Sequence, residues 1–146
     1  MKEKIVIGWR ETLALPSLGI HQINAKIDTG ARTSCLHAFK VERFEKCGNQ
    51  WARFWIHPIQ NDLDTVVVCE AKIIDQRSVR DSGGHEEQRY VIEADVQLGD
   101  RTWSAEFTLT NRENMKFRML LGRTAMQEHL LVDSSLSYTI AFKECK

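Results

Sequence analysis

Apolar residues recur at every second position along much of the chain. The alternation is clearest in residues 22–27, 91–98 and 103–109, where polar or charged side chains separate the apolar ones. A period of two places apolar side chains on one face of a β-strand, whereas an amphipathic helix repeats about every 3.6 residues. The chain is therefore predicted to consist mainly of strands, and the first of these stretches ends directly before Asp28.

Turn residues divide these stretches into hairpins, because glycine and asparagine adopt the positive φ angles that tight turns require. One stretch, residues 123–130, has the composition of a short helix, and residues 131–140 resemble a final strand. Many short strands with one late helix predict a single all-β domain, a barrel or a sandwich, over residues 1–146. The predicted hairpins turn at Gly99-Asp100, at Gly48-Asn49 ahead of residues 51–56, and at Ser82-Gly83-Gly84 between residues 65–79 and 88–98.

The composition is that of an ordinary globular protein. Of 146 residues, 42% are hydrophobic and 27% are charged, and 20 basic residues balance 20 acidic ones. A formal net charge of zero argues against a nucleic-acid binder that depends on bulk electrostatics. No apolar run approaches the ~20 residues that cross a bilayer, and residues 1–11 carry charges too early for a signal peptide. We expect a cytoplasmic protein that binds neither nucleic acid nor membrane.

The cysteines show no Cys-x-x-Cys spacing and are expected to be reduced thiols. Cys35 and His37 would share one face of a strand, but a single pair supplies too few ligands for zinc. There is also no His-Glu-x-x-His sequence, so we expect no metal and no other cofactor. The four cysteines are Cys35, Cys47, Cys69 and Cys145.

The strand that ends at Ile27 leads into Asp28-Thr29-Gly30. A strand fixes the position of the carboxylate, and the glycine lets the backbone turn sharply beside a ligand. Two such carboxylates about 3 Å apart share one proton, so that one activates a water and the other polarises a scissile carbonyl. Because the sequence has one Asp-Thr-Gly, the second aspartate must come from another copy of the chain. Turn chemistry, with Asp28 capping the backbone, explains the tripeptide equally well, and other segments must decide.

A second segment, residues 119–126, favours the catalytic interpretation. With it, the chain resembles the retroviral-type aspartic proteases, or retropepsins. These have Asp-Thr-Gly-Ala near the N-terminus and, later, two or three apolar residues followed by Gly-Arg and a short helix. The resemblance covers about residues 22–140 and implies an acid-protease barrel with one short C-terminal helix, active as a homodimer. The matching elements are Asp28-Thr29-Gly30-Ala31, Leu120-Leu121-Gly122-Arg123 and, in the place of the retropepsin flap, Ser82-Gly83-Gly84.

A narrower resemblance is to a bacterial retropepsin-like family often labelled ATP-dependent zinc protease. That family occurs alone, or beside or fused to RimK-type ligases, which add glutamates to a carboxyl terminus. The resemblance therefore implies a functional link to such a ligase. The zinc and ATP of the label are rejected here, because the sequence has neither a zinc-peptidase motif nor a Gly-x-x-x-x-Gly-Lys-Ser/Thr loop. The matching segments are Ile7–Glu11, Lys26–Ser34, Thr108–Arg112 and Met119–Ala125.

The resemblance also implies a set of site residues. Asp28, Thr29 and Gly30 form the expected catalytic loop, and the Thr29 hydroxyl is placed to bond across a subunit interface. The residues expected to bind substrate are Ala31, Arg32, Thr33, Arg80, Ser82, Gly83, Gly84, Arg89 and Arg123.

Arg32 departs from the retropepsin pattern, in which an aspartate commonly stands at this position and pairs with the later arginine, here Arg123. Two uncompensated guanidinium groups would either recruit another acid or bind the carboxylates of a substrate, which a guanidinium fork fits well. The acids available for such a pair are Glu86, Glu87 and Glu93. A glutamate-rich or glutamate-tailed peptide is therefore the first substrate class to test.

Other charged and aromatic residues allow two interpretations. Arg80 and Arg89 flank the expected flap and either add to the positive field or form ordinary surface ion pairs. His85 at the flap tip is taken as incidental. The core or a dimer interface is the expected setting of Trp9, Trp51, Trp55 and Trp103.

Taken together, the sequence predicts a homodimeric aspartic endopeptidase whose catalytic carboxylate is Asp28. Two alternatives stay open: a peptide-binding module of the same fold without turnover, and a metal-dependent hydrolase. The distance between two Asp28 carboxylates distinguishes the endopeptidase from the peptide-binding module. Metal analysis after chelation distinguishes it from the metal-dependent hydrolase.

Overall fold

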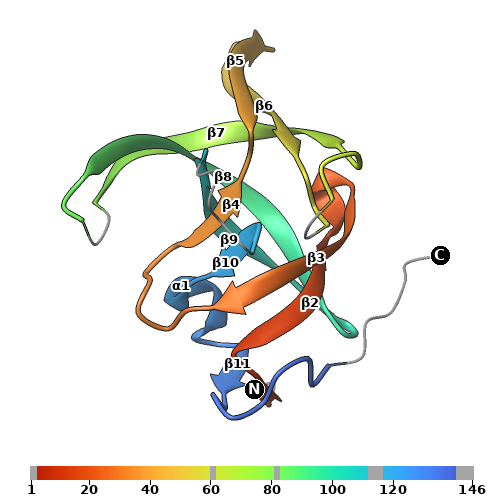
Figure 1. Cartoon of the computed structure of the whole chain (residues 1–146). Coiled ribbons are helices and arrows are strands. Elements are labelled where there is room, and N and C mark those ends of the chain that lie inside the picture. The colour runs from red at the N-terminus through yellow and green to blue at the C-terminus, as the bar shows by residue number, and fades with distance from the viewer. Residues whose placement is uncertain (1–2, 60–61, 81–82, 112–116, 141–146) are drawn as a thin grey trace.

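Figure 1 shows the computed structural model of the chain, which describes residues 3–59, 62–80, 83–111 and 117–140. Within these residues the fold consists of strands with one short helix late in the chain, so the all-β expectation is confirmed. The elements are β1 (Ile5–Ile7), β2 (Arg10–Leu15), η1 (Pro16–Leu18, a 3-10 turn), β3 (Ile20–Ile27), β4 (Ser34–His37), β5 (Lys40–Lys46), β6 (Asn49–Ile56), β7 (Val67–Arg80), β8 (Glu86–Leu98), β9 (Arg101–Thr110), β10 (Met119–Leu121), α1 (Arg123–Met126) and β11 (Leu130–Val132).

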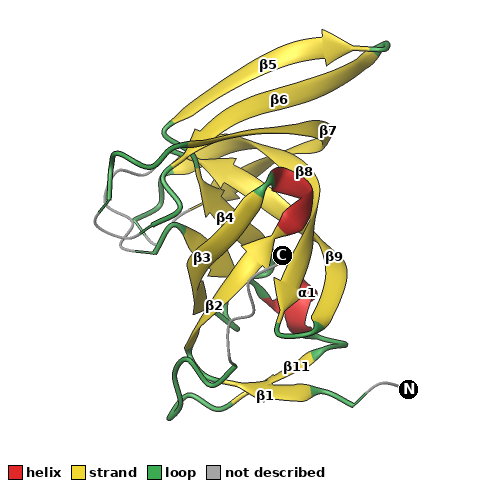
Figure 2. Ribbon diagram, turned by 90° about the vertical axis from the view of Figure 1, so that its right-hand side faces the viewer, coloured by secondary structure: helices red, strands yellow, loops and turns green. Residues whose placement is uncertain are grey.

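Nine of the described strands form one curled sheet, in the order β2-β3-β10-β4-β9-β8-β7-β6-β5. β2 also meets β8 at a single residue pair, Ala14 with Gln97, so the sheet closes on itself only at that point (Figure 1). The core lies inside the curl, and its largest fully buried side chains include Phe54 and Phe107. Burial of one such side chain stabilises the fold by ~1.5–3 kcal/mol. β5 and β6 extend from this curl as a long hairpin, and β1 and β11 form a separate parallel pair (Figure 2).

The hairpin between β5 and β6 turns one residue earlier than the predicted Gly48-Asn49. Asn49 already pairs with Lys46, so the turn consists of Cys47 and Gly48. Both residues have a positive φ, 51° and 78°, which is what a two-residue turn between twisted strands favours.

The other two predicted hairpins are present. Gly99-Asp100 turns β8 into β9, and a longer hairpin joins β7 to β8. Gly83 and Gly84 are exposed in the turn of that hairpin, and Ser82 lies outside the described residues.

The helix predicted over residues 123–130 is only one turn long. α1 ends at Met126, and residues 127–129 form turns. The chain leaves the helix here because Leu130 begins β11 and pairs with Ile5 of β1. Pairing with a distant strand therefore ends a helix that the local composition would have continued.

The strand predicted over residues 131–140 is shorter as well, because β11 ends at Val132. Farther along, the backbone N–H groups of Thr139 and Ile140 donate to the carboxylate of Glu11. These donors are thus used by a side chain instead of a neighbouring strand.

Glu11 is fully buried, and its carboxylate ties together segments that are far apart in the sequence. It accepts hydrogen bonds from the backbone N–H groups of Gly8 (2.8 Å), Thr139 (3.0 Å) and Ile140 (3.2 Å), and from the Thr139 hydroxyl (2.7 Å). A carboxylate can be buried only when such bonds replace its hydration. Glu11 therefore fastens residues 139–140 to the segment that leads into β2.

Of the four tryptophans, only Trp103 packs against the core, so the core setting is confirmed for that residue and wrong for Trp9, Trp51 and Trp55. Trp9 is 37% exposed, and Trp51, Trp55 and Trp103 are only half-buried. Basic side chains lie over three of these rings and shield them partly from water. The carbonyl of Trp9 accepts the N–H of Ile27, so this residue borders the Asp28 loop.

Cys35, Cys47 and Cys69 form no disulfide with one another, and Cys145 lies outside the described residues. Burial raises the pKa of the Cys69 thiol to about 12. Among the described residues there is no helix with the length and apolar character needed to cross a bilayer.

Candidate active site

Asp28 lies where the chain crosses over the end of β10. That strand sits between β3 and β4, parallel to the first and antiparallel to the second. The loop of residues 28–33, which joins β3 to β4, must therefore pass across it. The N–H of Asp28 donates to the carbonyl of Leu121, the last residue of β10, at 2.9 Å. This bond fixes the start of the loop.

Further hydrogen bonds hold the rest of the loop. The N–H of Gly30 donates to Asp28 Oδ1 at 2.9 Å, and a Cβ at position 30 would lie 3.2 Å from the same oxygen. From α1, the Arg123 guanidinium Nη1 donates to the Thr29 carbonyl at 3.2 Å, and the Arg123 backbone N–H donates to the Ala31 carbonyl at 2.7 Å. The first N–H groups of a helix have no partner within it, so the loop carbonyls satisfy them.

Gly122 lets the loop pack directly on the chain before α1. A Cβ here would lie 2.6 Å from the Thr33 carbonyl carbon and 2.8 Å from the Ser34 nitrogen, so only glycine fits without a shift of backbone. The N–H of Gly122 donates to Oγ of the fully buried Ser34 at 2.9 Å. The Asp-Thr-Gly and Gly-Arg motifs, which are far apart in the sequence, are thus in contact.

A cavity of about 620 Å³ opens between this loop and the β7–β8 hairpin. Asp28 and Thr29 do not line it, but Gly30 does, and the cavity therefore begins immediately after the candidate catalytic residue. Its lining includes four arginines and, among the residues that the structure describes, no acid. Of the residues predicted to bind substrate, the cavity is lined by Ala31, Arg32, Thr33, Arg80 and Arg89.

Acids outside the cavity pair with three of these arginines. Arg32 is the exception, since its side chain makes no hydrogen bond or ion pair with the described residues and is exposed. The three paired arginines are Arg77 with Asp75 (2.7 Å) and Glu106 (3.1 Å), Arg89 with Glu87 (3.0 Å), and Arg80 with Glu86 (3.9 Å).

Arg77 is the best compensated of the four. The hydrogen bond from its guanidinium, together with one from the backbone N–H of Gln76, lowers the pKa of Asp75. The bonds to Asp75 and Glu106 raise the pKa of Arg77 in turn. Its charge is thus largely balanced by neighbouring carboxylates.

The acids considered as partners of Arg32 and Arg123 are used elsewhere. Glu86 and Glu87 face Arg80 and Arg89, while Glu93 accepts a hydrogen bond from the Ser104 hydroxyl at 2.9 Å. Arg32 was expected either to pair with one of these acids or to bind a substrate carboxylate, and the structure does not contain the first arrangement.

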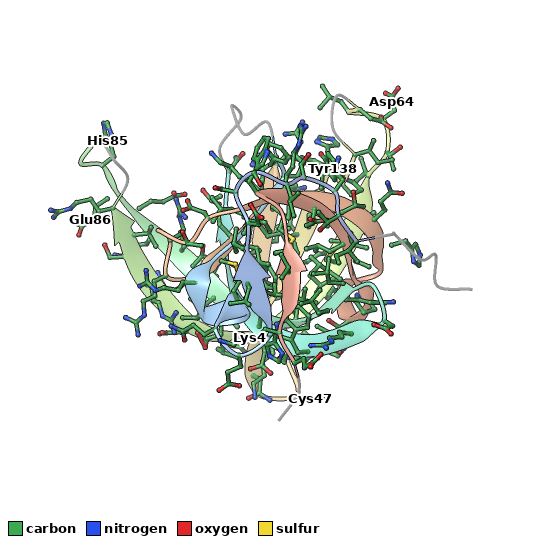
Figure 3. The ribbon with its side chains drawn as sticks, turned by 90° about the horizontal axis from the view of Figure 1, so that it is seen from below. Lys4, Cys47, Asp64, His85, Glu86 and Tyr138 are labelled. Carbon is green, nitrogen blue, oxygen red and sulfur yellow. The ribbon has the colours of Figure 1, made fainter. Side chains whose placement is uncertain are left out.

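Some predicted substrate-binding residues lie outside the cavity lining. The Arg123 guanidinium faces the Thr29 carbonyl, so this residue supports the loop. Gly83 and Gly84 lie at the exposed end of the β7–β8 hairpin, where Figure 3 shows His85 and Glu86 projecting from the body.

Sequence reasoning missed six residues that also line the cavity: Cys35, Arg77, Ser78, Val79, Thr108 and Leu120. A signal for Arg77 existed, because counting back from the Ser82-Gly83-Gly84 turn places it near Arg89, and the two pair directly across β7 and β8. No comparable pattern marked Cys35, which was considered only for metal binding. Within the described residues there is no cluster of three or more His, Cys, Asp and Glu side chains suited to a metal ion.

Residues 6–143 match the RimB-like family profile, described as retropepsin-like aspartic endopeptidase RimB. Proteins named probable alpha-L-glutamate ligase are similar over most of the chain: that of Shewanella pealeana is 46% identical over 96% of this chain and 31% of its own length. Those of Shewanella halifaxensis and Parasynechococcus marenigrum are 47% and 44% identical over 94% and 96% of this chain, and over 30% of their own lengths.

The chain therefore spans less than a third of the length of these curated relatives. Among solved structures, a protein of unknown function from Legionella pneumophila superposes with a TM-score of 0.79. It is 26% identical, and the match covers 94% of this chain and 98% of that one.

Proposed function

This chain belongs to the RimB-like family of retropepsin-like aspartic endopeptidases, and on that premise we propose that it hydrolyses peptide bonds with Asp28 as its catalytic carboxylate. The observation that carries the proposal is the fixed position of Asp28 beside the cavity. A hydrogen bond to the Leu121 carbonyl and hydrogen bonds from Gly30 and Arg123 hold the Asp28 loop in one geometry. A carboxylate held in this way is available for chemistry on a chain bound in the adjoining space.

The proposed reaction needs two copies of Asp28, one from each subunit. Two carboxylates about 3 Å apart cannot both ionise, an effect for which aspartic proteases are the general example. The ionised member takes a proton from a water, which attacks the scissile carbonyl. The protonated member gives its proton to that carbonyl oxygen, which forms a tetrahedral diol. The first carboxyl then passes the proton taken from water to the leaving amine, and one diol hydroxyl returns its proton to the other carboxylate as the C–N bond breaks, which restores the dyad and leaves a carboxylic acid. Thr29 is assigned to the subunit contact and Gly30 to the close approach of substrate backbone.

An exposed surface beside the loop, in which the Arg10 guanidinium lies over the Trp9 and Tyr138 rings, supports a homodimer. Trp9, Leu136 and Tyr138 are each more than a third exposed, and the Trp9 N–H donates to the Leu136 carbonyl. Trp9 also bonds Ile27, the residue before Asp28. Contact between two copies through this surface would cover it and bring both Asp28 loops together.

We further propose that the substrates are glutamate-rich or glutamate-tailed peptides. The cavity presents four arginines and, in the described lining, no acid, and guanidinium groups bind carboxylates bidentately. The similarity to proteins named glutamate ligases points the same way, because a protease linked to a RimK-type ligase would meet chains that carry added glutamates. Ala31 and Thr33 are assigned to the substrate backbone, and the β7–β8 hairpin with Gly83 and Gly84 is assigned to covering it.

The test is hydrolysis of an acidic peptide by the wild-type chain and by Asp28→Asn. The variant should lose turnover and keep its fold, because an amide cannot share the dyad proton. Asp95→Asn is the matched control, since Asp95 is exposed on β8 outside the cavity, and it should retain activity. Turnover by Asp28→Asn would refute the aspartyl mechanism. A wild-type chain that binds the peptide without cleaving it would instead favour the peptide-binding module.

A further inference from the structure

Two arginines stand directly opposite each other on β7 and β8. Arg77 pairs with Arg89 in the register of the hairpin, and both line the cavity. Like charges on opposed positions of a sheet repel each other. Each arginine is compensated by an acid two residues earlier on its own strand, Asp75 for Arg77 and Glu87 for Arg89.

The two arginines differ in burial and in how completely they are compensated. Arg77 is 39% exposed and has two carboxylate partners. The Arg89 side chain is only 8% exposed, and Glu87, its one carboxylate partner among the described residues, also accepts a hydrogen bond from the Thr110 hydroxyl. The Arg89 guanidinium is therefore the buried cation of the cavity wall.

Arg89 also keeps hydrogen-bonding capacity for a ligand. Its Nε donates to Glu87, and its Nη1 lies 3.6 Å from the sulfur of Cys35, a weak acceptor. Its other terminal nitrogen, Nη2, has no hydrogen-bond partner within the part of the chain that is described. A buried guanidinium is stable when carboxylates use its donors, and a substrate carboxylate would complete the set.

We propose that Arg89 is the specificity-determining residue, which binds the side-chain carboxylate of a substrate glutamate inside the cavity, and that Glu87 weakens this binding by competing for the same guanidinium. The inference rests on the proposed function, because it assigns the cavity to the substrate. Arg32 and Arg80, which are exposed, attract acidic chains without selecting one side chain. Arg77 is occupied by its own two acids.

The experiment measures binding in an Asp28→Asn background, so that hydrolysis cannot interfere. Acetyl-tetraglutamate amide and acetyl-tetraglutamine amide are titrated into the full chain by calorimetry. Arg89→Gln should weaken binding of the glutamate peptide roughly ten- to hundredfold and change that of the glutamine peptide by less than about threefold. Arg53→Gln is the matched control, because it also breaks an ion pair, with Glu70, but lies outside the cavity.

Glu87→Gln should increase the affinity for the glutamate peptide, a result that an unfolded variant cannot produce. With the competing carboxylate gone, the glutamate peptide should bind about fivefold more tightly and the glutamine peptide unchanged. The proposal is overturned if Glu87→Gln leaves the preference for glutamate unchanged or lowers it, or if Arg89→Gln weakens both peptides equally. It is also overturned if Arg77→Gln removes as much of the preference as Arg89→Gln, or if the parent protein shows no preference. These outcomes do not depend on turnover, so they are distinct from failure of the Asp28 mechanism.

Discussion

Replacing Gly122 with alanine tests whether close packing beneath the loop holds Asp28 in place. The new Cβ would lie 2.6 Å from the carbonyl carbon of Thr33 and 2.8 Å from both the Thr33 oxygen and the Ser34 nitrogen. Carbon atoms in contact normally stay about 3.5–4.0 Å apart, so the two backbones must separate by about 1 Å. All three atoms belong to the backbone, and no side-chain rotation can relieve the contact.

Two consequences follow for Gly122→Ala. Overpacking of this kind destabilises a protein by about 1–3 kcal/mol, which lowers the midpoint of urea unfolding. The shift also reaches Asp28, because the displaced loop is the one that carries it, and a misplacement of about 1 Å reduces kcat/KM by about a hundredfold. The backbone at position 122 is extended, with φ −93°, so alanine meets no conformational strain and the effect is one of space alone.

Gly99→Ala is the control for this variant. Position 99 lies in the β8–β9 turn with φ +62°, where alanine is strained by about 1 kcal/mol, but the turn is outside the cavity and the Asp28 loop. Gly99→Ala should therefore lose stability and keep its activity when folded. Wild-type stability and kcat/KM in Gly122→Ala, or an equal loss of activity in Gly99→Ala, would refute the reasoning.

Three further predictions concern single side chains. Glu11→Gln should destabilise the fold by about 2–4 kcal/mol in urea unfolding, because it removes the charge from four hydrogen bonds and turns an amide N–H₂ towards a donor. An unchanged unfolding midpoint would mean that these hydrogen bonds to Glu11 do not stabilise the fold. Arg32→Ala should reduce kcat/KM for acidic peptides about two- to fivefold at low salt and less at moderate salt, because this arginine is exposed; an equal loss on neutral peptides would assign it to the loop instead. The Cys69 thiol should stay unlabelled by a maleimide in the folded protein even at pH 9, since a pKa of about 12 leaves about one molecule in a thousand as thiolate; rapid labelling detected by mass spectrometry of that peptide would contradict its burial.

The local features of the site could be predicted from the sequence. A strand that ends directly before Asp28, and a sharp turn of the backbone at Gly30, follow from alternation and from turn chemistry, and both are present. Contact between the Asp28 loop and Gly122-Arg123 followed from resemblance alone, because the two segments are far apart in the sequence and no periodicity brings them together.

The side of the sheet that Arg77 faces could not be predicted from the alternation of residues, because the register of β7 shifts. The register shifts between Ile73, which pairs with Ile92, and Asp75, which pairs with Val91. Such a bulge sends the following residues to the other face of the sheet. Arg77 and Arg89 therefore face the cavity, whereas uninterrupted alternation would have placed Arg77 on the same face as Ile73.

The tryptophans and the final segment show a second limit of sequence reasoning. Aromatic residues in strands are usually buried, but here lysines of β5 lie over the Trp51 and Trp55 rings of β6, and this pairing across strands is not visible in the sequence. Likewise, the alternation of residues 131–140 is typical of a strand, yet Glu11, more than a hundred positions earlier, takes two of its N–H groups.

The most direct test of the central claim, one Asp28 from each of two subunits, is a subunit-mixing measurement. Wild-type chain and Asp28→Asn chain are mixed in varying ratio at constant total concentration, allowed to exchange, and assayed on one peptide. If a site needs two intact aspartates, activity follows the square of the wild-type fraction, so an equal mixture keeps about one quarter of the full rate. Activity proportional to the wild-type fraction, with about one half remaining in the equal mixture while sedimentation shows that mixed dimers have formed, would contradict the shared site.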